Sequence, residues 1–263
     1  MRDAVLEARD VSVVFGGIVA VDSVRLAVAP GEIVGIIGPN GAGKTTLLNA
    51  LCGFVDLAGG VVLLGGDEVT ALPPYRRARL GLGRSFQDAR LFPGLTVREV
   101  LLGAQHPAFR SGVFSEGLRL PLARHDERDA ITAVGDVLEL VDVARYLDHR
   151  VADLSFGTTR AVELAWLAAR RPRVLLLDEP AAGLQQSEVA VLGDLIRRIR
   201  GDAAVVVIDH DVPFVAGLVD RLVAMDLGRV VVEGDVGHVL HHPDVLASYL
   251  GGSRYADVTG SAT

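Results

Sequence analysis

One short glycine-rich segment decides the fold: Gly38-Pro39-Asn40-Gly41-Ala42-Gly43-Lys44-Thr45-Thr46. Four residues separate two glycines, and a lysine and a hydroxyl residue follow, which is the pattern of a phosphate-binding loop. Glycine lets backbone N–H groups approach an anion without a Cβ in the way, and a helix that follows adds the positive end of its dipole. The pattern predicts that Lys44 bridges the β- and γ-phosphates of a nucleotide, while the Thr45 hydroxyl coordinates Mg²⁺.

The surroundings of this segment favour the phosphate-binding interpretation over a glycine-rich turn with a chance lysine. Residues 32–37 predict a buried strand and residues 44–51 a helix, which is the context that the loop requires. Lys44 is also the only lysine of the chain, and all other basic residues are arginine. Arginine has replaced lysine elsewhere, so Lys44 marks a position that needs a compact ammonium rather than a planar guanidinium.

Composition limits the class of protein. Of the 263 residues, 50% are hydrophobic and 22% charged, which predicts a globular protein. The chain has a net charge of −7, which argues against nucleic acid as a partner. Its apolar runs are too short to span a membrane, and its first residues lack the pattern of a signal peptide, so we expect a cytoplasmic location. The single cysteine, Cys52, is expected to fill a core position, and the basic cluster at residues 76–79 to form a solvated helix face.

Three sequence patterns, each typical of a different secondary structure, follow one another along the chain. The first thirty residues alternate apolar and polar side chains, which predicts antiparallel strands. Residues 88–169 show helical periodicity, with a loop or short broken helices over residues 103–127. Beyond residue 170, strands near 174–177, 204–208, 222–225 and 229–232 alternate with helices near 187–200 and 212–218. The fold class is therefore α/β, with a mostly parallel sheet, an N-terminal antiparallel β subdomain and an inserted helical subdomain.

A second motif lies at the end of the apolar segment 173–177. Asp178 and Glu179 follow it directly. An acidic pair at a strand end is common, but downstream of a phosphate-binding loop it indicates a nucleotide site. Asp178 would hold Mg²⁺, through its water shell, and Glu179 would polarise the attacking water as a general base.

The segment Leu154-Ser155-Phe156-Gly157-Thr158, together with these two motifs, resembles the ABC ATPase family over nearly all of residues 4–250. It is similar to the family signature Leu-Ser-Gly-Gly-Gln, although a simple serine N-cap would explain Ser155 as well. The resemblance implies that Ser155, Phe156, Gly157 and Thr158 face the γ-phosphate of the ATP bound to a second ATPase subunit. It also implies one ABC ATPase domain over residues 1–250, with a core of 1–87 and 170–250, a helical subdomain of about 88–169 and a flexible tail of 251–263.

Three further positions match the family pattern in order. Gln87 looks like the glutamine that senses Mg²⁺ and the attacking water, and His210 looks like the switch histidine that contacts the γ-phosphate. Phe15 looks like the aromatic residue that stacks on adenine, although an aromatic residue on a strand is more often part of a core. The resemblance thus implies that Gln87, Glu179 and His210 are catalytic, that Thr45, Gln87 and Asp178 bind the metal, and that ATP and Mg²⁺ are the ligands.

The chain departs from the family pattern at two motifs. In the signature, Phe156 replaces the first glycine and Thr158 the glutamine, and in the segment 181–185 Gln185 replaces the usual aspartate or asparagine. These changes bear on the rate of turnover and on whether the opposing subunit is identical.

Several stretches are similar to the ATPases of branched-chain amino-acid importers, among them 15–22, 83–87, 91–97, 178–184 and 245–251. That branch implies a peripheral subunit on the cytoplasmic face of the membrane. Its partners are two transmembrane permease subunits, a second ATPase subunit and, indirectly, an extracytoplasmic substrate-binding protein. Alternatives are urea or amide import, lipopolysaccharide export, a non-transport ABC ATPase acting on ribosomes or DNA, and a non-catalytic nucleotide sensor.

Overall fold

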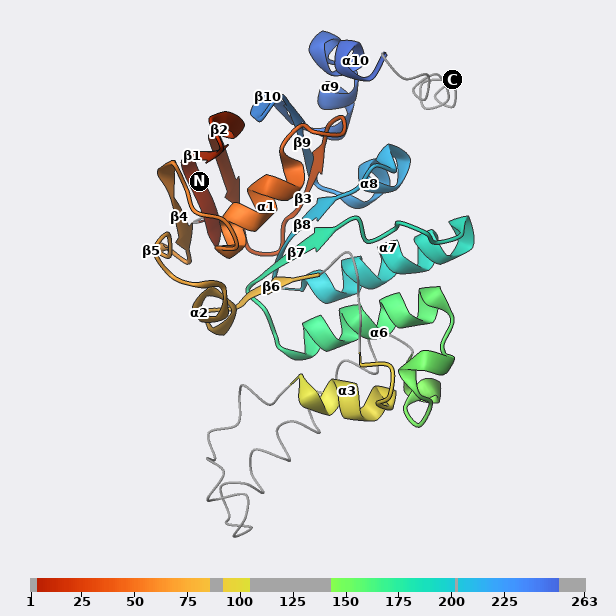
Figure 1. Ribbon diagram of the computed structural model, residues 1–263. Helices are drawn as coiled ribbons and strands as arrows, with labels where there is room; N and C mark the ends of the chain where they lie inside the picture. Colours follow the sequence, from red (N-terminus) through yellow and green to blue (C-terminus); the bar gives the residue numbers. More distant parts are fainter. Residues whose placement is uncertain (1–3, 86–91, 105–142, 202, 251–263) are drawn as a thin grey trace. The chain divides into compact units, whose positions relative to one another are not determined.

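The structure is a computed structural model that describes residues 4–85, 92–104, 143–201 and 203–250 (Figure 1). Its contacts divide the chain into two compact units. The first unit comprises Met1–Gln87, Arg173–Ala182 and Arg200–Thr263, and the second comprises Asp88–Pro172 and Gly183–Ile199.

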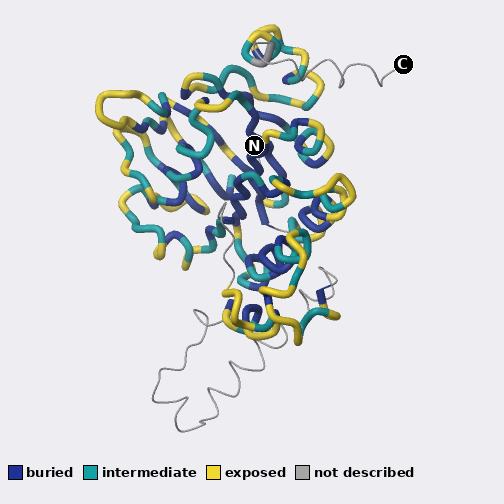
Figure 2. The backbone as a smooth tube through the Cα atoms, turned by 45° about the vertical axis from the view of Figure 1, so that its right-hand side comes forward, coloured by how far each residue is buried: buried dark blue, intermediate teal, exposed yellow. Residues whose placement is uncertain are grey.

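A six-stranded sheet forms the centre of the first unit, in the order β10-β9-β3-β8-β7-β6. All neighbours pair in parallel except β10, which runs antiparallel to β9. The central strands β3, β7 and β8 are buried at every residue, as their apolar sequences predict for all positions but Asp178, the last residue of β7. Figure 2 shows buried segments gathered in the interior of the fold. The strands are β3 (Ile33–Ile37), β6 (Leu82–Arg84), β7 (Val174–Asp178), β8 (Ala204–Ile208), β9 (Arg221–Asp226) and β10 (Arg229–Gly234).

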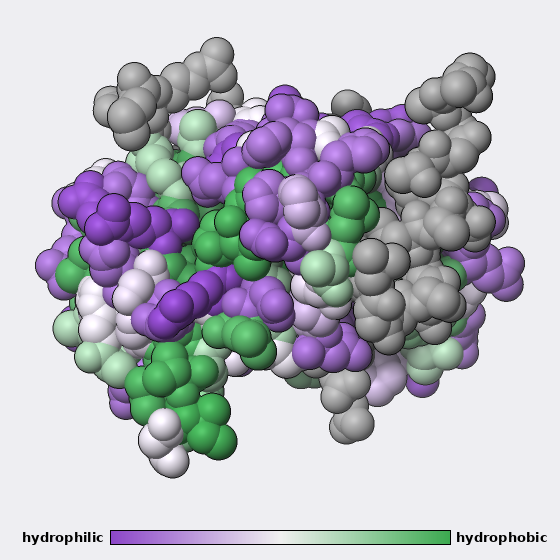
Figure 3. Space-filling view, turned by 90° about the horizontal axis from the view of Figure 1, so that it is seen from above, coloured by the Kyte–Doolittle hydropathy of each residue, from purple (hydrophilic) through white to green (hydrophobic). Residues whose placement is uncertain are grey.

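The N-terminal strands form a separate antiparallel sheet of the order β2-β1-β4-β5, which confirms the alternation seen in the sequence. Its strands are β1 (Leu6–Phe15), β2 (Ile18–Val28), β4 (Gly59–Leu64) and β5 (Asp67–Glu68). Buried residues of β1, β2 and β4 share one core with α1 (Lys44–Cys52) and one face of β3. The ends of β1 and β2 that flank their turn instead expose Val14, Phe15, Ile18 and Val19. Figure 3 shows hydrophobic areas among hydrophilic ones on the face that it displays.

Helices cover both faces of the central sheet in the first unit. α1 lies in the core shared with the antiparallel sheet, while α8 (Val212–Leu218) and α9 (Val236–Leu240) pack against the opposite face, with Ile37 and Leu222. The unit also contains α2 (Pro74–Arg79) and α10 (Pro243–Leu250). This layering leaves the carboxyl ends of the parallel strands free to carry loops, where α/β proteins bind ligands.

The expectation of a solvated face at residues 76–79 is wrong for Arg77. Its guanidinium is buried and donates to the carbonyl oxygens of Ala50, Leu51, Leu72 and Thr70, at 2.7–2.9 Å. Two of these carbonyls belong to the last turn of α1, where carbonyl groups lack partners within the helix. Arg77 therefore caps α1, and a cationic cap also suits the negative end of the helix dipole.

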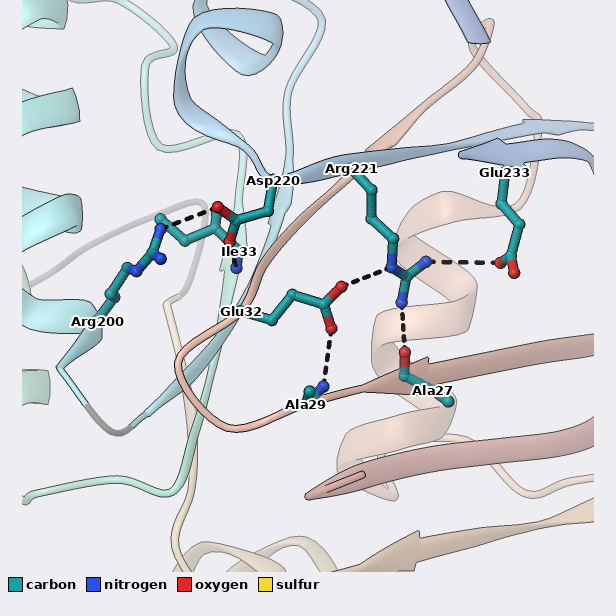
Figure 4. A network of polar contacts seen from close by, with 8 residues as sticks. All are labelled: Ala27, Ala29, Glu32, Ile33, Arg200, Asp220, Arg221 and Glu233. Atoms are coloured by element: carbon teal, nitrogen blue, oxygen red, sulfur yellow. Dashed lines mark hydrogen bonds and ion pairs between the residues drawn. The ribbon is translucent and has the colours of Figure 1, made fainter. Parts of the chain in front are cut away.

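A polar network fixes the start of β3, the strand that leads into the phosphate-binding segment (Figure 4). Glu32 accepts hydrogen bonds from the backbone N–H of Ala29, at 2.8 Å, and from Arg221 Nε, at 2.7 Å. Arg221 also donates to the carbonyl oxygen of Ala27 on β2. One carboxylate and one guanidinium thus connect the antiparallel sheet to the central sheet.

The second unit is helical where the structure describes it, in agreement with the periodicity of the sequence. Its main helices are α3 (Val97–Gly103), α6 (Phe156–Ala169) and α7 (Gln186–Arg200), with 3₁₀ turns η2 (Ala144–Tyr146) and η3 (Val151–Asp153). Thr96 and Glu99 form a capping box that starts α3. The loop expected over residues 103–127 falls almost entirely outside the described residues.

Candidate nucleotide-binding site

The loop between β3 and α1 wraps around the ammonium of Lys44. Lys44 Nζ donates to the carbonyl oxygens of Gly38, at 2.7 Å, and Pro39, at 2.9 Å. A Cβ atom at Gly38 would collide with the carbonyl oxygen of Met225, and one at Gly43 (φ 93°) with that of Ala20. Only glycine fits these two positions, which explains the spacing of the motif in physical terms.

Asp178 lies across from the start of α1. β7 delivers its side chain to the carboxyl edge of the sheet, where Oδ1 lies 3.4 Å from the hydroxyl oxygen of Thr45. The two residues are far apart in sequence, and the parallel sheet brings them together. A hydroxyl and a carboxylate are oxygen donors of the kind that Mg²⁺ prefers, so the pair fits a site for that ion.

Burial shapes the electrostatics of these groups. It raises the pKa of Asp178, while the positive charge of Arg84 and hydrogen bonds from Arg84 and Thr45 oppose that rise. Burial also lowers the pKa of Lys44, and the nearby carboxylates of Glu179 and Asp178 oppose that change. The site thus places cations and carboxylates where low solvent access strengthens their interactions.

Glu179 has an unusual backbone conformation. Its φ is +48°, in the left-handed region that residues with a Cβ rarely adopt, and its N–H donates to the carbonyl oxygen of Ile208, at 2.7 Å. Such conformations cost about 1–3 kcal/mol and tend to occur at functional sites. The sharp turn changes the direction of the chain directly after Asp178.

His210 follows β8, the strand next to β7, and its side chain is 60% exposed. Its Nδ1 lies 3.4 Å from Oδ1 of the buried Asp209. Asp209 in turn accepts hydrogen bonds from the backbone N–H groups of Ala181, at 2.9 Å, and Asp211, at 3.0 Å. Asp209 therefore ties the loop after β7 to the loop after β8, a connection that the sequence motifs did not indicate.

The remaining predicted residues are placed as follows. Phe15 lies at the exposed end of β1, with its side chain 49% exposed, so it is not a core residue. Gln87 lies outside the described residues. In the second unit, Ser155 caps α6 by accepting a hydrogen bond from the Thr158 N–H at 3.2 Å, and the two hydroxyl groups are 2.9 Å apart. The Phe156 ring is 54% exposed and lies against Gly183 and the guanidinium of Arg160.

Two side chains that sequence reasoning missed also reach Asp178. Arg84 Nη2 donates to Asp178 Oδ2 at 3.1 Å, and Arg84 Nη1 donates to Asn49 Oδ1 at 2.5 Å. Ser85 Oγ accepts from the backbone N–H of Asp178 at 3.0 Å. Only the nearness of Arg84 and Ser85 to Gln87 could have drawn attention to them.

Within the part of the chain that the structure describes, no helix is long and apolar enough to cross a membrane. The fold and the loop geometry define an α/β nucleotide-binding protein with a phosphate-binding loop. The model of the ABC transporter family matches residues 21–182, and the chain belongs to that family. It is an ATP hydrolase of the ABC type, with the fold of an ABC ATPase cassette.

Curated relatives match over almost their whole length. The chain is 37% identical to the high-affinity branched-chain amino acid transport ATP-binding protein LivG of Escherichia coli K12, over 95% of this chain and 99% of that protein. Identity and coverage are the same for the corresponding protein BraF of Pseudomonas aeruginosa. The crystal structure of the ADP conformation of MJ1267, an ATP-binding cassette of an ABC transporter, is 26% identical with a TM-score of 0.82, and covers 95% of this chain and 99% of that one.

Proposed function

We propose that this chain is the ATP-hydrolysing subunit of an importer for branched-chain or related amino acids. The observation that carries the nucleotide site is the meeting of Lys44, Thr45 and Asp178 at the carboxyl ends of β3 and β7. The substrate class is supported by the relatives LivG and BraF, whose names state branched-chain amino acid transport.

The residues of the first unit have distinct roles in this proposal. The backbone N–H groups of residues 40–46 and the Lys44 ammonium bind the phosphates. When they do so, Lys44 exchanges its contacts with the carbonyl oxygens of Gly38 and Pro39 for contacts with phosphate oxygens. Thr45 and Asp178 hold Mg²⁺, which neutralises charge on the phosphate oxygens. Glu179 takes a proton from the attacking water, and its left-handed backbone conformation sets the position of its side chain after β7.

The other site residues complete the proposal. Gln87 and His210 contact the attacking water and the γ-phosphate, and Asp209 orients the His210 ring from the side of Nδ1. Phe15 offers an exposed ring to the adenine, and such a ring can stack on a base. Ser155, Phe156, Gly157 and Thr158 face the ATP of a second ATPase subunit, where the start of α6 supplies the positive end of a helix dipole.

The partners follow from the same family. Two transmembrane permease subunits form the pathway, a second ATPase subunit completes the nucleotide sites, and an extracytoplasmic binding protein delivers the amino acid. The chain then works at the cytoplasmic face of the membrane. Purification together with the permeases supports transport, whereas purification with ribosomes contradicts it.

Two substitutions test the nucleotide site. Lys44→Ala removes the only lysine side chain, so we expect ATP affinity to fall by about tenfold or more in a titration with a fluorescent ATP analogue.

Glu179→Gln keeps the shape of the side chain but cannot take a proton, so we expect ATP binding to persist while phosphate release by the assembled complex falls by at least about 100-fold. Unchanged phosphate release from the Glu179→Gln complex would contradict the assignment.

A further inference from the structure

A single guanidinium connects three elements beside the proposed metal site. Arg84 is the last residue of β6, and its side chain is only 10% exposed. Its Nη1 donates to Asn49 on α1, at 2.5 Å, and its Nη2 to Asp178 on β7, at 3.1 Å. The planar fork of arginine can make both bonds at once with a fixed angle between them, which a lysine ammonium on a flexible stem cannot do.

The contact with Arg84 divides the two oxygens of Asp178 between different partners. Oδ2 accepts from Arg84, while Oδ1 lies 3.4 Å from the Thr45 hydroxyl. The backbone of Asp178 is held as well, because its N–H donates to Ser85 Oγ at 3.0 Å. Adjacent residues of one segment thus hold both the side chain and the backbone of Asp178.

We propose that Arg84 is a positioning residue for Asp178, and that it turns Oδ1 toward Thr45 so that the two oxygens form the metal site. Asn49 has an indirect effect, because it accepts a hydrogen bond from Arg84 and holds the guanidinium against α1. Partners of this kind that orient the ligands of a metal affect its affinity by about 10–100-fold when they are removed. The inference rests on the proposed function, because it assigns Thr45 and Asp178 to Mg²⁺.

Arg77 offers a matched control in the same unit. It is another buried arginine that packs against α1, but its four hydrogen bonds go to backbone carbonyl oxygens and none of them to Asp178. Removing it disturbs the end of α1 distant from Thr45. A variant of Arg77 therefore reports what a merely structural loss does to nucleotide binding.

The test measures how much Mg²⁺ increases the affinity for ATP, and does not depend on ATP hydrolysis. A fluorescent ATP analogue is titrated into the full chain carrying Glu179→Gln, once with Mg²⁺ and once with EDTA, and the ratio of the two affinities is compared among variants. For Arg84→Met we expect affinity with Mg²⁺ to fall about tenfold, with affinity in EDTA unchanged within about twofold. Arg84→Lys, which keeps the charge, should recover part of the loss, and Asn49→Ala should show a smaller loss confined to the Mg²⁺ titration.

Other results of these titrations would contradict either the role of Arg84 or the nucleotide site itself. An equal fall in both titrations, as expected for Arg77→Met if that variant weakens binding at all, would mean that Arg84 is merely structural. No fall for Arg84→Met, or a rise, would also overturn the inference. If Arg84→Met does not fold by circular dichroism, Arg84→Lys decides by the same ratio. A parent chain that binds no ATP, or binds it equally in EDTA, would instead overturn the proposed nucleotide site.

Discussion

At the scale of single residues, the site depends on a strained position next to a buried one. Asp178 is buried and held by Arg84 and Thr45, and the chain turns at Glu179 through a left-handed conformation. Folding stability is reduced by that strain, whereas the placement of the Glu179 carboxylate depends on it. Stability and function therefore make opposite demands at this residue.

We predict that Glu179→Gly stabilises the chain while abolishing ATP hydrolysis. Glycine adopts a positive φ without strain, and after the entropy that it adds to the unfolded chain the gain should be about 1 kcal/mol in the free energy of unfolding. Glu179→Gln is the control, since it loses the carboxylate but keeps the strain, and its stability should not rise. Urea denaturation measures the free energy of unfolding of both variants. Equal values for Glu179→Gly and Glu179→Gln would show that the backbone strain is not significant.

At the scale of secondary-structure elements, α1 is held at both ends by features outside the helix. Its start is the phosphate-binding loop, and its end is capped by Gly53, which has a positive φ, and by the guanidinium of Arg77. The position of Thr45 relative to Asp178 depends on the direction of this helix. Arg77 thus stabilises the end of the helix that is distant from Thr45, rather than the site itself.

We predict that Arg77→Met destabilises the chain by about 3 kcal/mol. The substitution removes the donor of the carbonyl oxygens of Leu51, Thr70 and Leu72, while Ala50 keeps only the N–H of Gly53. Carbonyl groups left without a donor cost more than the loss of an average hydrogen bond. Arg76→Met, at the exposed neighbouring position, should change stability by less than about 0.5 kcal/mol. Thermal and urea unfolding of the two variants compares them, and similar values would contradict the capping role.

At the scale of the whole molecule, the structure has two units, and the first is itself composed of two sheets. The two sheets of the first unit share a core around α1. The polar network of Glu32 and Arg221 also joins β2 to β9 at the start of β3 (Figure 4). Because β3 leads into the phosphate-binding loop, the register of this strand sets the position of the loop.

We predict that Glu32→Ala lowers the free energy of unfolding by about 1–2 kcal/mol, since it removes a partly buried ion pair and a bond to the Ala29 N–H. Glu233 also lies near Arg221, at 3.5 Å, but its side chain is 55% exposed. Glu233→Ala should therefore change stability by less than about 0.5 kcal/mol. Equal losses in urea denaturation would mean that the network acts only through its net charge.

The sequence alone predicted the phosphate-binding loop, the alternation of strands and helices and the two sheets. These features depend on local patterns: glycines with positive φ in residues 38–43, and uninterrupted apolar strands such as Ile33–Ile37. Residues 86–91 and 105–142 lie outside the described part, so the predictions for Gln87 and for the loop at 103–127 remain predictions.

Only the tertiary structure decided which side chains surround Asp178 and which hold α1. Arg84, Asn49 and Asp178 come from three elements, and Arg77 looked like a surface residue because its neighbours are charged. Such contacts follow from strand order and helix packing, which bring together residues that no spacing rule relates. Local pattern therefore specified the nucleotide-binding loop, and long-range packing determined the side chains that hold its acidic partner.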